Sequence, residues 1–588
     1  MKEILSKINI LLNKNQKKEL AFIVFLSIIG GFLETFSISV IIPYMSIVVD
    51  QTVLTSSRWG RILLSIFPDT PFNRLLIYLT LILMAAFLIK NVFLHLLYIL
   101  LRKFTVKNFY LTSSKLFYAY LAKPYSYFTD HNSSEILSVI THNMGKCYAL
   151  IQALLSILAE MVVLVLLLFV MLFMNWRITI LTFLLTGSIS FILKKLITPQ
   201  LTKIGRDSNN EYTKMIKAVK ESLDGIKEIK LMQREDAFLD VYNKSGKENV
   251  RLEVKKAFYS NATSRIVETV TVWEILVFIL IILILQTTSD ALFTQLTAMG
   301  LVVIRLMPCM TRINNQISIV SHSKSAFIGI TDEIEEYLES TKDMNDTTEE
   351  MAFTDSVCIN NVSFRYPDTD KDVLSDINFA INKGDKVGII GSSGSGKTTL
   401  VDLIMGYWKA TEGSITVDGN DIHSNLKGWF RHIGYIPQTI FLLDGTIYDN
   451  IAFGSSIVTE ERVWKALEQS HLDEFVKTLP KGIYTDIGEN GIKLSGGQRQ
   501  RLGIARALFN DPDIIVFDEA TSALNSELES EITDTIYELA DDKTIIMIAH
   551  RHTSLKGCDY IIEVEDGKII KHTTEEILEK EHETEITS

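Results

Sequence analysis

Cysteine is scarce in this sequence, and the few cysteines that occur lie far apart. The chain has four among its 588 residues: Cys147, Cys309, Cys358 and Cys558. This spacing matches neither a disulfide framework nor a set of zinc ligands, so it excludes a disulfide-stabilised secreted fold. We expect four free thiols in a reducing compartment.

The N-terminus lacks the pattern of a cleavable signal peptide. Its first hydrophobic run, at residues 20–49, is preceded by a mixed polar segment, so we expect that run to stay in the protein as a membrane anchor. Hydrophobic residues make up 47% of the chain, and the mean hydropathy is positive. These values exclude an ordinary soluble enzyme.

Charge is divided unevenly between two parts of the chain. Residues 1–340 hold 35 Lys and Arg against 26 Asp and Glu, whereas the remainder holds 23 against 44. A basic, apolar part followed by an acidic part indicates a membrane domain joined to a water-soluble one. We therefore predict a transmembrane domain at 1–340, a hydrophilic linker at 341–354 and a nucleotide-binding domain at 355–588.

Six apolar segments approach the length that spans a bilayer. They lie at about 20–49, 73–101, 151–174, 177–197, 267–286 and 291–310. Long helix-compatible polar stretches follow the second and fourth segments, and they carry many Lys and Arg residues. By the positive-inside bias this side is cytoplasmic. On the opposite side, 56–67 predicts a small amphipathic surface helix.

From residue 355 short β-rich runs alternate with helical stretches. The runs 357–362, 386–390, 514–517 and 544–548 are the clearest strand candidates. This alternation predicts an α/β domain. The predicted fold class is thus a membrane domain of six transmembrane helices followed by an α/β nucleotide-binding domain.

A glycine-rich phosphate loop follows the apolar run that ends at Ile390. Its glycines allow backbone N–H groups to approach phosphates, and the following helix N-terminus favours negative charge. We expect Lys397 to reach the β- and γ-phosphates of ATP and the Thr398 hydroxyl to ligate Mg²⁺. The predicted nucleotide-binding residues here are Gly391, Ser392, Ser393, Gly394, Ser395, Gly396, Lys397, Thr398 and Thr399.

Two carboxylates, Asp518 and Glu519, end the apolar run 514–517. A carboxylate at the end of a buried strand can orient the shell of a magnesium ion, and the next one can polarise water for attack on the γ-phosphate. The alternative is a pair of solvated acids that cap a helix.

Between these motifs lies Leu494-Ser495-Gly496-Gly497-Gln498, and with it the chain resembles the ATP-binding cassette (ABC) family. In that family this signature closes over the ATP of a partner subunit, which implies a dimer. The resemblance makes Asp518 a magnesium ligand and Glu519 the catalytic base. It also makes Gln438 a metal-sensing residue and His550 a γ-phosphate contact.

Three further positions match or depart from the family pattern. Tyr366 resembles the aromatic residue that stacks on adenine, with a core tyrosine as the alternative. Glu489 resembles a residue that touches the partner's cytoplasmic loops. Asn525 stands where the family usually has Asp. Because Glu519 and the signature are both present, we expect a homodimer with two active sites.

Six helices followed by one cassette resemble the exporter branch of the family. The resemblance implies ATP hydrolysis coupled to transport, with coupling segments near 122–133 and 225–236. We expect a multi-pass protein of the bacterial cytoplasmic membrane, with its cassette and both termini in the cytoplasm. The six spans exclude a soluble ABC protein, and we expect no nucleic-acid partner. A nucleotide-gated channel stays open as an alternative.

The membrane part also resembles one subgroup, the lipid-linked oligosaccharide flippases of bacterial N-glycosylation. The matching stretches are 34–39 with Pro43, 132–137 and 305–308. This resemblance implies transport of a lipid-linked oligosaccharide, or a related amphiphilic lipid, from the inner to the outer leaflet. Export of bacteriocin-like peptides or hydrophobic drugs is the alternative.

Charged residues inside the spans bear on the substrate independently. Lys90 and Arg265 lie about 26–32 Å from the outer helix ends and Arg305 about 21 Å, at 1.5 Å per residue. Charges at such depth are costly and usually face a cavity or a partner. We expect these three to hold an anionic headgroup. Three acidic residues near mid-depth allow two alternatives to this role: the acids pair with these basic residues, or they bind a cationic substrate. These acids are Glu34, Glu160 and Glu274.

Overall fold

The computed structural model divides into two compact units. One comprises Met1–Lys123 and Tyr127–Asp343, and the other comprises Pro124–Ser126 and Met344–Ser588. The structure describes residues 2–577 apart from 50, 57, 69, 175, 285–289, 344–350, 368, 456, 520–532, 534–536, 538–542, 550 and 551. At some further positions, which include 290–305, it describes the backbone but not the side chains. All four cysteines are free thiols.

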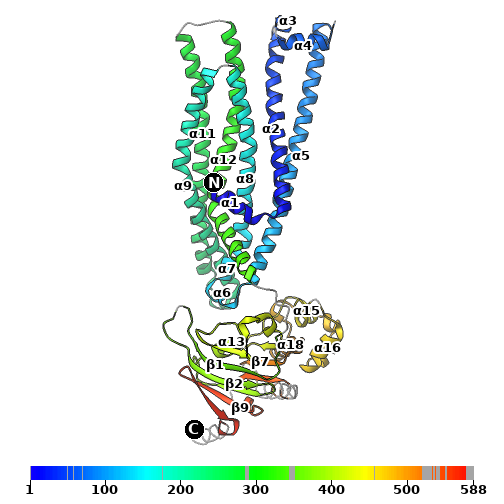
Figure 1. The fold of residues 1–588 in the computed structure, drawn as a ribbon, viewed down its shortest axis with the longest axis vertical. Coiled ribbons are helices and arrows are strands. Elements are labelled where there is room, and N and C mark those ends of the chain that lie inside the picture. The colour runs from blue at the N-terminus through cyan, green and yellow to red at the C-terminus, as the bar shows by residue number, and fades with distance from the viewer. Residues whose placement is uncertain are drawn as a thin grey trace. The chain divides into compact units, whose positions relative to one another are not determined.

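In the described part of the chain, six long helices make up most of the first unit (Figure 1). They are α2 (Lys14–Val49), α5 (Phe72–Leu121), α8 (Met144–Met174), α9 (Trp176–Asp224), α11 (Glu235–Ile284) and α12 (Asp290–Asp343). At 1.5 Å per residue the 50-residue α5 is about 75 Å long, so it extends well beyond a bilayer core of about 30 Å. Among the described residues, three segments are long and apolar enough to cross a membrane: Lys14–Met45, Phe72–Leu121 and Ser133–Leu172.

Short helices connect the long ones. They are α3 (Val53–Ser56), α4 (Arg58–Ile66), α6 (Tyr125–Asp130), α7 (Ser133–Ser138), the π-helix η1 (Val139–Asn143) and α10 (Ile226–Met232). The amphipathic helix that the sequence predicts at 56–67 corresponds to α4. The helical path breaks at α6 and α10, within the two segments proposed for coupling.

Helix α1 (Lys2–Leu11) precedes α2 and was not predicted from the sequence. Its Ile4 and Leu11 are 3% exposed and belong to a core shared with α5, α8 and α12. Lys7 pairs with Asp332 and Glu335 on α12. The N-terminal segment is therefore packed on the bundle, and its short apolar face is buried there.

The second unit contains two sheets. One is antiparallel, in the order β2-β1-β4-β5, and consists of β1 (Ser356–Phe364), β2 (Leu374–Asn382), β4 (Glu412–Val417) and β5 (Asn420–Asp421). The other has the order β10-β9-β3-β8-β7-β6 and consists of β3 (Lys386–Ile390), β6 (Ile433–Ile436), β7 (Ile514–Asp518), β8 (Thr544–Ile548), β9 (Tyr560–Glu565) and β10 (Lys568–Thr573).

Strands β3, β6, β7, β8 and β9 pair in parallel, and β10 pairs antiparallel to β9. All five residues of β7 and of β8 are buried, as near-continuous apolar runs in a parallel sheet require. The four strand runs predicted from the sequence correspond to β1, β3, β7 and β8. The predicted fold class is confirmed.

Helices cover this second sheet and supply its remaining core. They are α13 (Lys397–Met405), α14 (Leu426–Phe430), α15 (Ile447–Ala452), α16 (Glu460–Gln469), α17 (Asp473–Thr478) and α18 (Gly496–Leu508), with the short turns η2 (Ile422–Ser424), η3 (Gly482–Tyr484), η4 (Glu489–Gly491) and η5 (His552–Leu555). The core between the two sheets includes Trp429, which is fully buried and donates from Nε1 to the Ile404 carbonyl at 3.0 Å.

Candidate nucleotide site and membrane charges

The parallel sheet brings the sequence motifs together at one edge. The phosphate loop follows β3, Asp518 ends β7, and Gln438 comes two residues after β6. Because parallel strands all end at the same sheet edge, three segments that are distant in the sequence meet there. Two backbone hydrogen bonds tighten this edge: Glu519 donates to the Ile548 carbonyl at 3.2 Å, and Ala549 donates to the Ile389 carbonyl at 3.4 Å.

The phosphate loop requires glycine for two separate reasons. Gly391, Gly394 and Gly396 have φ of +146°, +81° and +109°, in the region that L side chains disfavour. A side chain at Gly391 would also place its Cβ 2.3 Å from the carbonyl oxygen of Val564 on β9. The loop is therefore held against the neighbouring strand, with α13 starting directly after it.

The polar groups of the loop are arranged as in an anion cradle. Lys397 is 5% exposed, and its Nζ donates to the carbonyls of Gly391 and Ser392, both at 2.9 Å. The Ser395 hydroxyl is buried and has no hydrogen-bond partner among the described residues. Ser393 and Thr398 are exposed. An orphaned hydroxyl beside a buried ammonium fits a loop that accepts phosphate oxygens.

Asp518 is held by a hydrogen bond from a tyrosine. It is 9% exposed, and the Tyr435 hydroxyl donates to its Oδ2 at 3.1 Å. Burial raises the pKa of Asp518, although the Tyr435 hydrogen bond opposes this shift. Nearby on α13, burial and the charge of Asp518 raise the pKa of Asp402 to about 6. No role was predicted for Tyr435 or Asp402 from the sequence, because their closeness to Asp518 depends on the packing of β6 and α13 beside β7.

Glu519 and Gln438 meet directly. The side-chain amide of Gln438 donates from Nε2 to Glu519 Oε2 at 2.7 Å. Glu519 has φ +48°, which is uncommon for a residue other than glycine. Such backbone strain is concentrated at functional sites, because the surrounding structure must hold it in place. The arrangement fixes the carboxylate at the sheet edge.

The residues proposed as magnesium ligands form an all-oxygen set. The Thr398 hydroxyl is exposed, Asp518 offers a carboxylate, and the Gln438 amide retains its oxygen because its nitrogen contacts Glu519. Magnesium prefers hard oxygen ligands of this kind. Within the described residues, His, Cys, Asp and Glu form no cluster of three or more that could hold a metal ion.

Tyr366 is half-buried: one side of it packs on the core, and the rest is accessible to solvent. Its hydroxyl shares a 2.9 Å hydrogen bond with the Thr399 hydroxyl on α13, and its ring packs edge-on against Phe364 and Trp408. This placement ties Tyr366 to the phosphate-loop helix. Both the adenine-stacking role and the core role predicted for it stay compatible with a partly exposed ring.

The signature serine caps a helix rather than meeting the chain's own phosphate loop. The Ser495 hydroxyl accepts from the Gln498 backbone N–H at 3.2 Å, and Gln498 Oε1 accepts from the Ser495 N–H at 2.9 Å. This reciprocal capping box starts the 13-residue α18. Ser495 and Gly496 are exposed. Across the described part of the chain, no hydrogen bond joins Ser495, Gly496, Gly497 or Gln498 to the loop.

Three predicted features fall outside the described residues. They are His550, the stretch with Asn525, and the side chain of Arg305. Glu489 is described and lies exposed in the η4 turn before the signature.

The structure separates the charges proposed to bind substrate. Lys90 on α5 is half-buried, with its Nζ 4.6 Å from the centroid of the Phe87 ring. Arg265 on α11 has a side chain 80% exposed, and it pairs with Glu268 one turn away at 2.9 Å. Both cations are therefore on helix surfaces rather than in the packed core.

One of the mid-depth acids pairs with a base that the sequence analysis did not consider. Arg312 on α12 forms a two-pronged ion pair with Glu160 on α8, at 2.5 and 3.0 Å. The Glu160 side chain is 16% exposed, and the Cys309 thiol donates to its backbone carbonyl at 3.3 Å. Arg312 was not among the predicted intramembrane charges, because it follows the end of the predicted span at residue 310. Glu34 and Glu274 are half-buried.

Comparison with known proteins identifies both units. Residues 20–307 match the sequence family described as the ABC transporter transmembrane region, and residues 374–522 match the family described as ABC transporter. Over the full length, the fold is similar to a bacterial Atm1-family ABC exporter with ATP bound, with a TM-score of 0.80, 20% identity and 97% of each chain covered.

Curated relatives cover most of the chain at about the same level of identity. The chain is 30% identical over 467 residues to the ATP-dependent lipid A-core flippase of Pseudomonas aeruginosa, covering 78% of this chain and 75% of the relative. It is 32% identical over 405 residues to an uncharacterized ABC transporter ATP-binding protein of Bacillus subtilis, and the match covers 68% of this chain and 69% of the relative.

Proposed function

The chain belongs to the ABC transporter family as an exporter half-transporter that couples ATP hydrolysis to transport, and from this premise we propose that it flips a lipid-linked oligosaccharide or a related amphiphilic lipid. The proposed direction is from the inner to the outer leaflet of the bacterial cytoplasmic membrane. The distribution of Lys and Arg along the sequence supports a cytoplasmic location for the cassette and both termini.

The observation that carries the lipid substrate is the position of Lys90. It is half-buried on an apolar helix and has no carboxylate partner among the described residues. Its neighbours Leu88 and Ile89 are each 67% exposed, as expected of a surface that faces lipid. A cation at that depth needs a counter-charge, and an anionic lipid headgroup supplies one where an uncharged drug or a purely cationic peptide does not.

Two kinds of relative support the lipid class. Several curated relatives at about 30% identity are named lipid A-core flippases. The resemblance at 34–39, 132–137 and 305–308 favours the lipid-linked oligosaccharide within that class. Peptide or drug export remains the competing hypothesis, and the experiment below includes it.

We further propose that two copies of the chain form two composite ATP sites. The exposed signature, capped within α18 and separate from its own phosphate loop, supports this arrangement. In each site one chain contributes the loop, Asp518 and Glu519, and the other contributes Ser495. The phosphates then lie between the positive ends of two helices, α13 and α18.

Within a site each residue has a distinct proposed task. Lys397 leaves the two backbone carbonyls it now contacts and binds the β- and γ-phosphate oxygens. Thr398, Gln438 and Asp518 hold Mg²⁺, which supplies positive charge that offsets the charge on the phosphates. Glu519 accepts the proton of the attacking water. His550 contacts the γ-phosphate and Tyr366 the adenine.

Reconstitution tests the substrate directly. Proteoliposomes with wild-type protein and with the variant Lys90→Gln, Arg265→Gln, Arg305→Gln should be compared for flipping of a fluorescent lipid-linked oligosaccharide and for ATP hydrolysis. We expect the triple variant to lose flipping but retain basal hydrolysis, because these residues touch no nucleotide. Unimpaired flipping by this variant would contradict capture by basic residues. Stimulation of hydrolysis by cationic peptides alone would favour peptide export instead.

A further inference from the structure

Helices α9 and α11 are attached to the first unit differently from the other long helices. They lie beside α8 and α12 (Figure 1). In the described part of the chain, the buried apolar cores of this unit contain no residue of α9 or α11. By contrast, α8 and α12 share such a core, which includes Leu167 and Cys309. Polar contacts therefore contribute much of the attachment of the α9–α11 pair to the α8–α12 pair.

One group of these polar contacts joins α8 and η1 to α9, outside the six predicted apolar segments. The Lys146 ammonium on α8 donates to the Asn209 amide oxygen on α9. The His142 ring on η1 stacks on Tyr212 of α9, with 3.8 Å between the ring centroids. His142 Nε2 is buried and has no hydrogen-bond partner among the described residues. The π-helical form of η1 is itself frequent at functional sites.

A second buried histidine, His322 on α12, lies against both α9 and α11. It is 3% exposed, and its Nε2 is 3.5 Å from Glu253 Oε1 on α11. This nitrogen makes no hydrogen bond within the described part of the chain. On the α9 side, a Cβ at Gly205 would overlap the carbonyl oxygen of His322, so only glycine allows this close approach. The imidazole is therefore enclosed between three helices.

The charged groups that surround these histidines are mainly positive. The titratable groups that face the two rings are Lys146 on α8, Tyr212 on α9, and Glu253 and Lys256 on α11. His322 and Lys256 lower the pKa of Glu253 to about 2, so this carboxylate stays charged in mild acid. Burial lowers the pKa of His322, although Glu253 opposes this shift. On α12 itself, Lys324 is paired with Glu3 of α1 at 3.2 Å.

We propose that His142 and His322 form a proton-binding site that controls how firmly the α9–α11 pair is attached to the α8–α12 pair. Neutral imidazoles fit the enclosed layer, whereas an imidazolium there loses its hydration close to Lys146 and Lys256. When the pairs separate, each ring meets water and takes up a proton near its ordinary pKa of about 6.5. Protons therefore favour separation, and the attachment weakens as the pH falls below about 6.5.

The size of the response follows from the number of protons. One proton that binds only in the separated arrangement, with a pKa of about 6.5, shifts the ratio of separated to attached molecules about ten-fold between pH 7.5 and pH 5.5. Two histidines together give at most about a hundred-fold shift. The site is independent of the transported substrate, because neither histidine belongs to the nucleotide site or to the basic residues of the proposed function.

Spin-label distances in the full chain test the site. In nanodiscs without nucleotide, labels at Gly145→Cys on α8 and Asn210→Cys on α9 report the separation of the two pairs by double electron–electron resonance. Both positions are exposed, and a Cβ at Gly145 meets no atom within 4 Å. Labels at Gly145→Cys and Gly329→Cys, which has equally open space on α12, report the apolar α8–α12 contact. The native cysteines are replaced by alanine, and each dimer carries one labelled copy.

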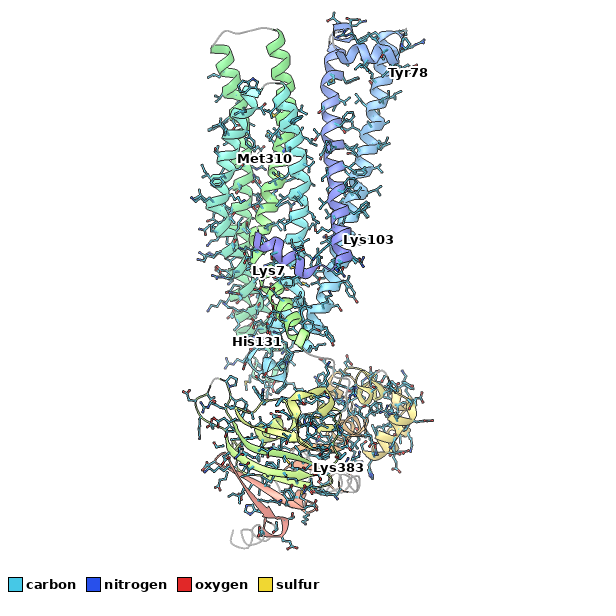
Figure 2. The ribbon with its side chains drawn as sticks, in the orientation of Figure 1. Lys7, Tyr78, Lys103, His131, Met310 and Lys383 are labelled. Carbon is cyan, nitrogen blue, oxygen red and sulfur yellow. The ribbon has the colours of Figure 1, made fainter. Side chains whose placement is uncertain are left out.

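We expect acid to lengthen the α8–α9 distance but not the α8–α12 distance. The ratio of separated to attached molecules should rise about ten-fold for each histidine in the wild type. The double variant His142→Gln, His322→Gln should show no such rise, because glutamine keeps a polar side chain that does not titrate. His131→Gln is the matched control, since His131 is exposed at the end of α6 and is labelled in Figure 2. It should respond as the wild type does.

An α8–α9 distance distribution that is unchanged in acid would overturn the proposal, and so would a response that persists in the double variant. An equal change in the α8–α12 distance would mean general acid unfolding and would overturn it as well. If the double variant does not fold, the two single variants decide, because each should retain about half of the response on a logarithmic scale. A normal acid response in a protein that flips no lipid would contradict the proposed function alone.

Discussion

Gln438 Nε2 donates to Glu519 Oε2 at 2.7 Å, and this hydrogen bond joins the residue proposed to sense Mg²⁺ to the residue proposed as the base. The bond ties the segment after β6 to the end of β7, where Glu519 has a strained φ of +48°. Any rearrangement of Gln438 toward a metal ion must therefore also change the environment of Glu519. If the two proposed roles are correct, this hydrogen bond couples metal binding to the activation of water.

Glu519→Gln should bind ATP but hydrolyse it about 10²–10⁴-fold more slowly, because the loop and metal ligands remain while the proton acceptor is lost. An amide at this position can still hydrogen-bond to Gln438, so the fold should be maintained. Nucleotide occlusion and phosphate release measure the two effects. Glu412→Gln, an exposed carboxylate on β4, serves as the control. Hydrolysis within a few-fold of wild type would show that another group is the base.

Mixed dimers should reveal whether the ATP sites are shared between chains. A Lys397→Ala chain paired with a Ser495→Arg chain places both lesions in one composite site and leaves the other intact. Such dimers should occlude nucleotide at one site, whereas each pure mutant dimer should occlude none. Differently tagged chains, purified over two affinity steps, allow the comparison. Equal occlusion in mixed and pure dimers would argue against sharing.

Tyr435→Phe should weaken divalent-metal binding about 10–100-fold, because loss of a residue that orients a metal ligand has effects of this size. The hydroxyl donates to Asp518, so its removal frees that carboxylate to rotate. Binding of Mn²⁺ in the presence of ATP, followed by electron paramagnetic resonance, measures this without turnover. Tyr560→Phe removes a comparable hydroxyl–carboxylate contact, with Asp385, and should leave metal affinity unchanged. If Tyr435→Phe and Tyr560→Phe bind Mn²⁺ with equal affinity, Tyr435 does not help to position the metal ligand Asp518.

Asp418 anchors the start of the second unit and should make its stability depend on pH. Burial raises its pKa, but hydrogen bonds from Thr354, Asp355 and Ser356 outweigh burial and lower the pKa to about 2. A lowered folded pKa stabilises the fold above the unfolded value of 3.8, and this contribution disappears as the pH falls towards 2.

Asp418→Asn should therefore lower the free energy of unfolding by about 1 kcal/mol at pH 7, because it weakens charge-assisted hydrogen bonds whose contribution is reduced by solvent screening at this accessible carboxylate. The difference from wild type should narrow as the pH falls below about 4. Thermal unfolding followed by fluorescence of the buried Trp429 provides the measurement. The exposed Asp370→Asn should behave as wild type throughout. A constant difference at all pH values would mean that the carboxylate charge is not the cause.

Arg312→Met should destabilise the first unit because it leaves the Glu160 carboxylate without its partner. We expect a loss on the order of 2 kcal/mol, below the value for fully buried pairs because the Arg312 side chain is 42% exposed. Adding Glu160→Gln should recover most of this loss. Arg265→Met breaks only an exposed pair and should cost less than about 0.5 kcal/mol. Equal losses in the single and double variants would show that the pair does not contribute.

The motif residues could be predicted because their chemistry is local in the sequence. The loop glycines, Lys397 and the Ser495 cap depend on backbone conformation over a few residues. Their neighbours on β3 and α18 have the strand and helix patterns that support them. The six apolar segments can likewise be recognised in the sequence, because the thickness of the bilayer sets the length of each apolar run.

Other contacts could not be read from the chain. Tyr435 meets Asp518 only because β6 and β7 are neighbours in the sheet, 83 residues apart in the sequence. Arg312 meets Glu160 only because α12 packs on α8, 152 residues away. Such pairs carry no periodicity or spacing that a single sequence can display.

The sequence by itself determined the apolar spans, the strands and the phosphate-binding loop, because these follow from short-range chemistry, and the resemblance of its motifs to a family indicated an exporter. Only the tertiary structure decided which charges are paired, which polar groups are left unsatisfied and which histidines are enclosed between the helices. Those properties depend on the packing of side chains from distant segments, and packing is settled by the fold as a whole.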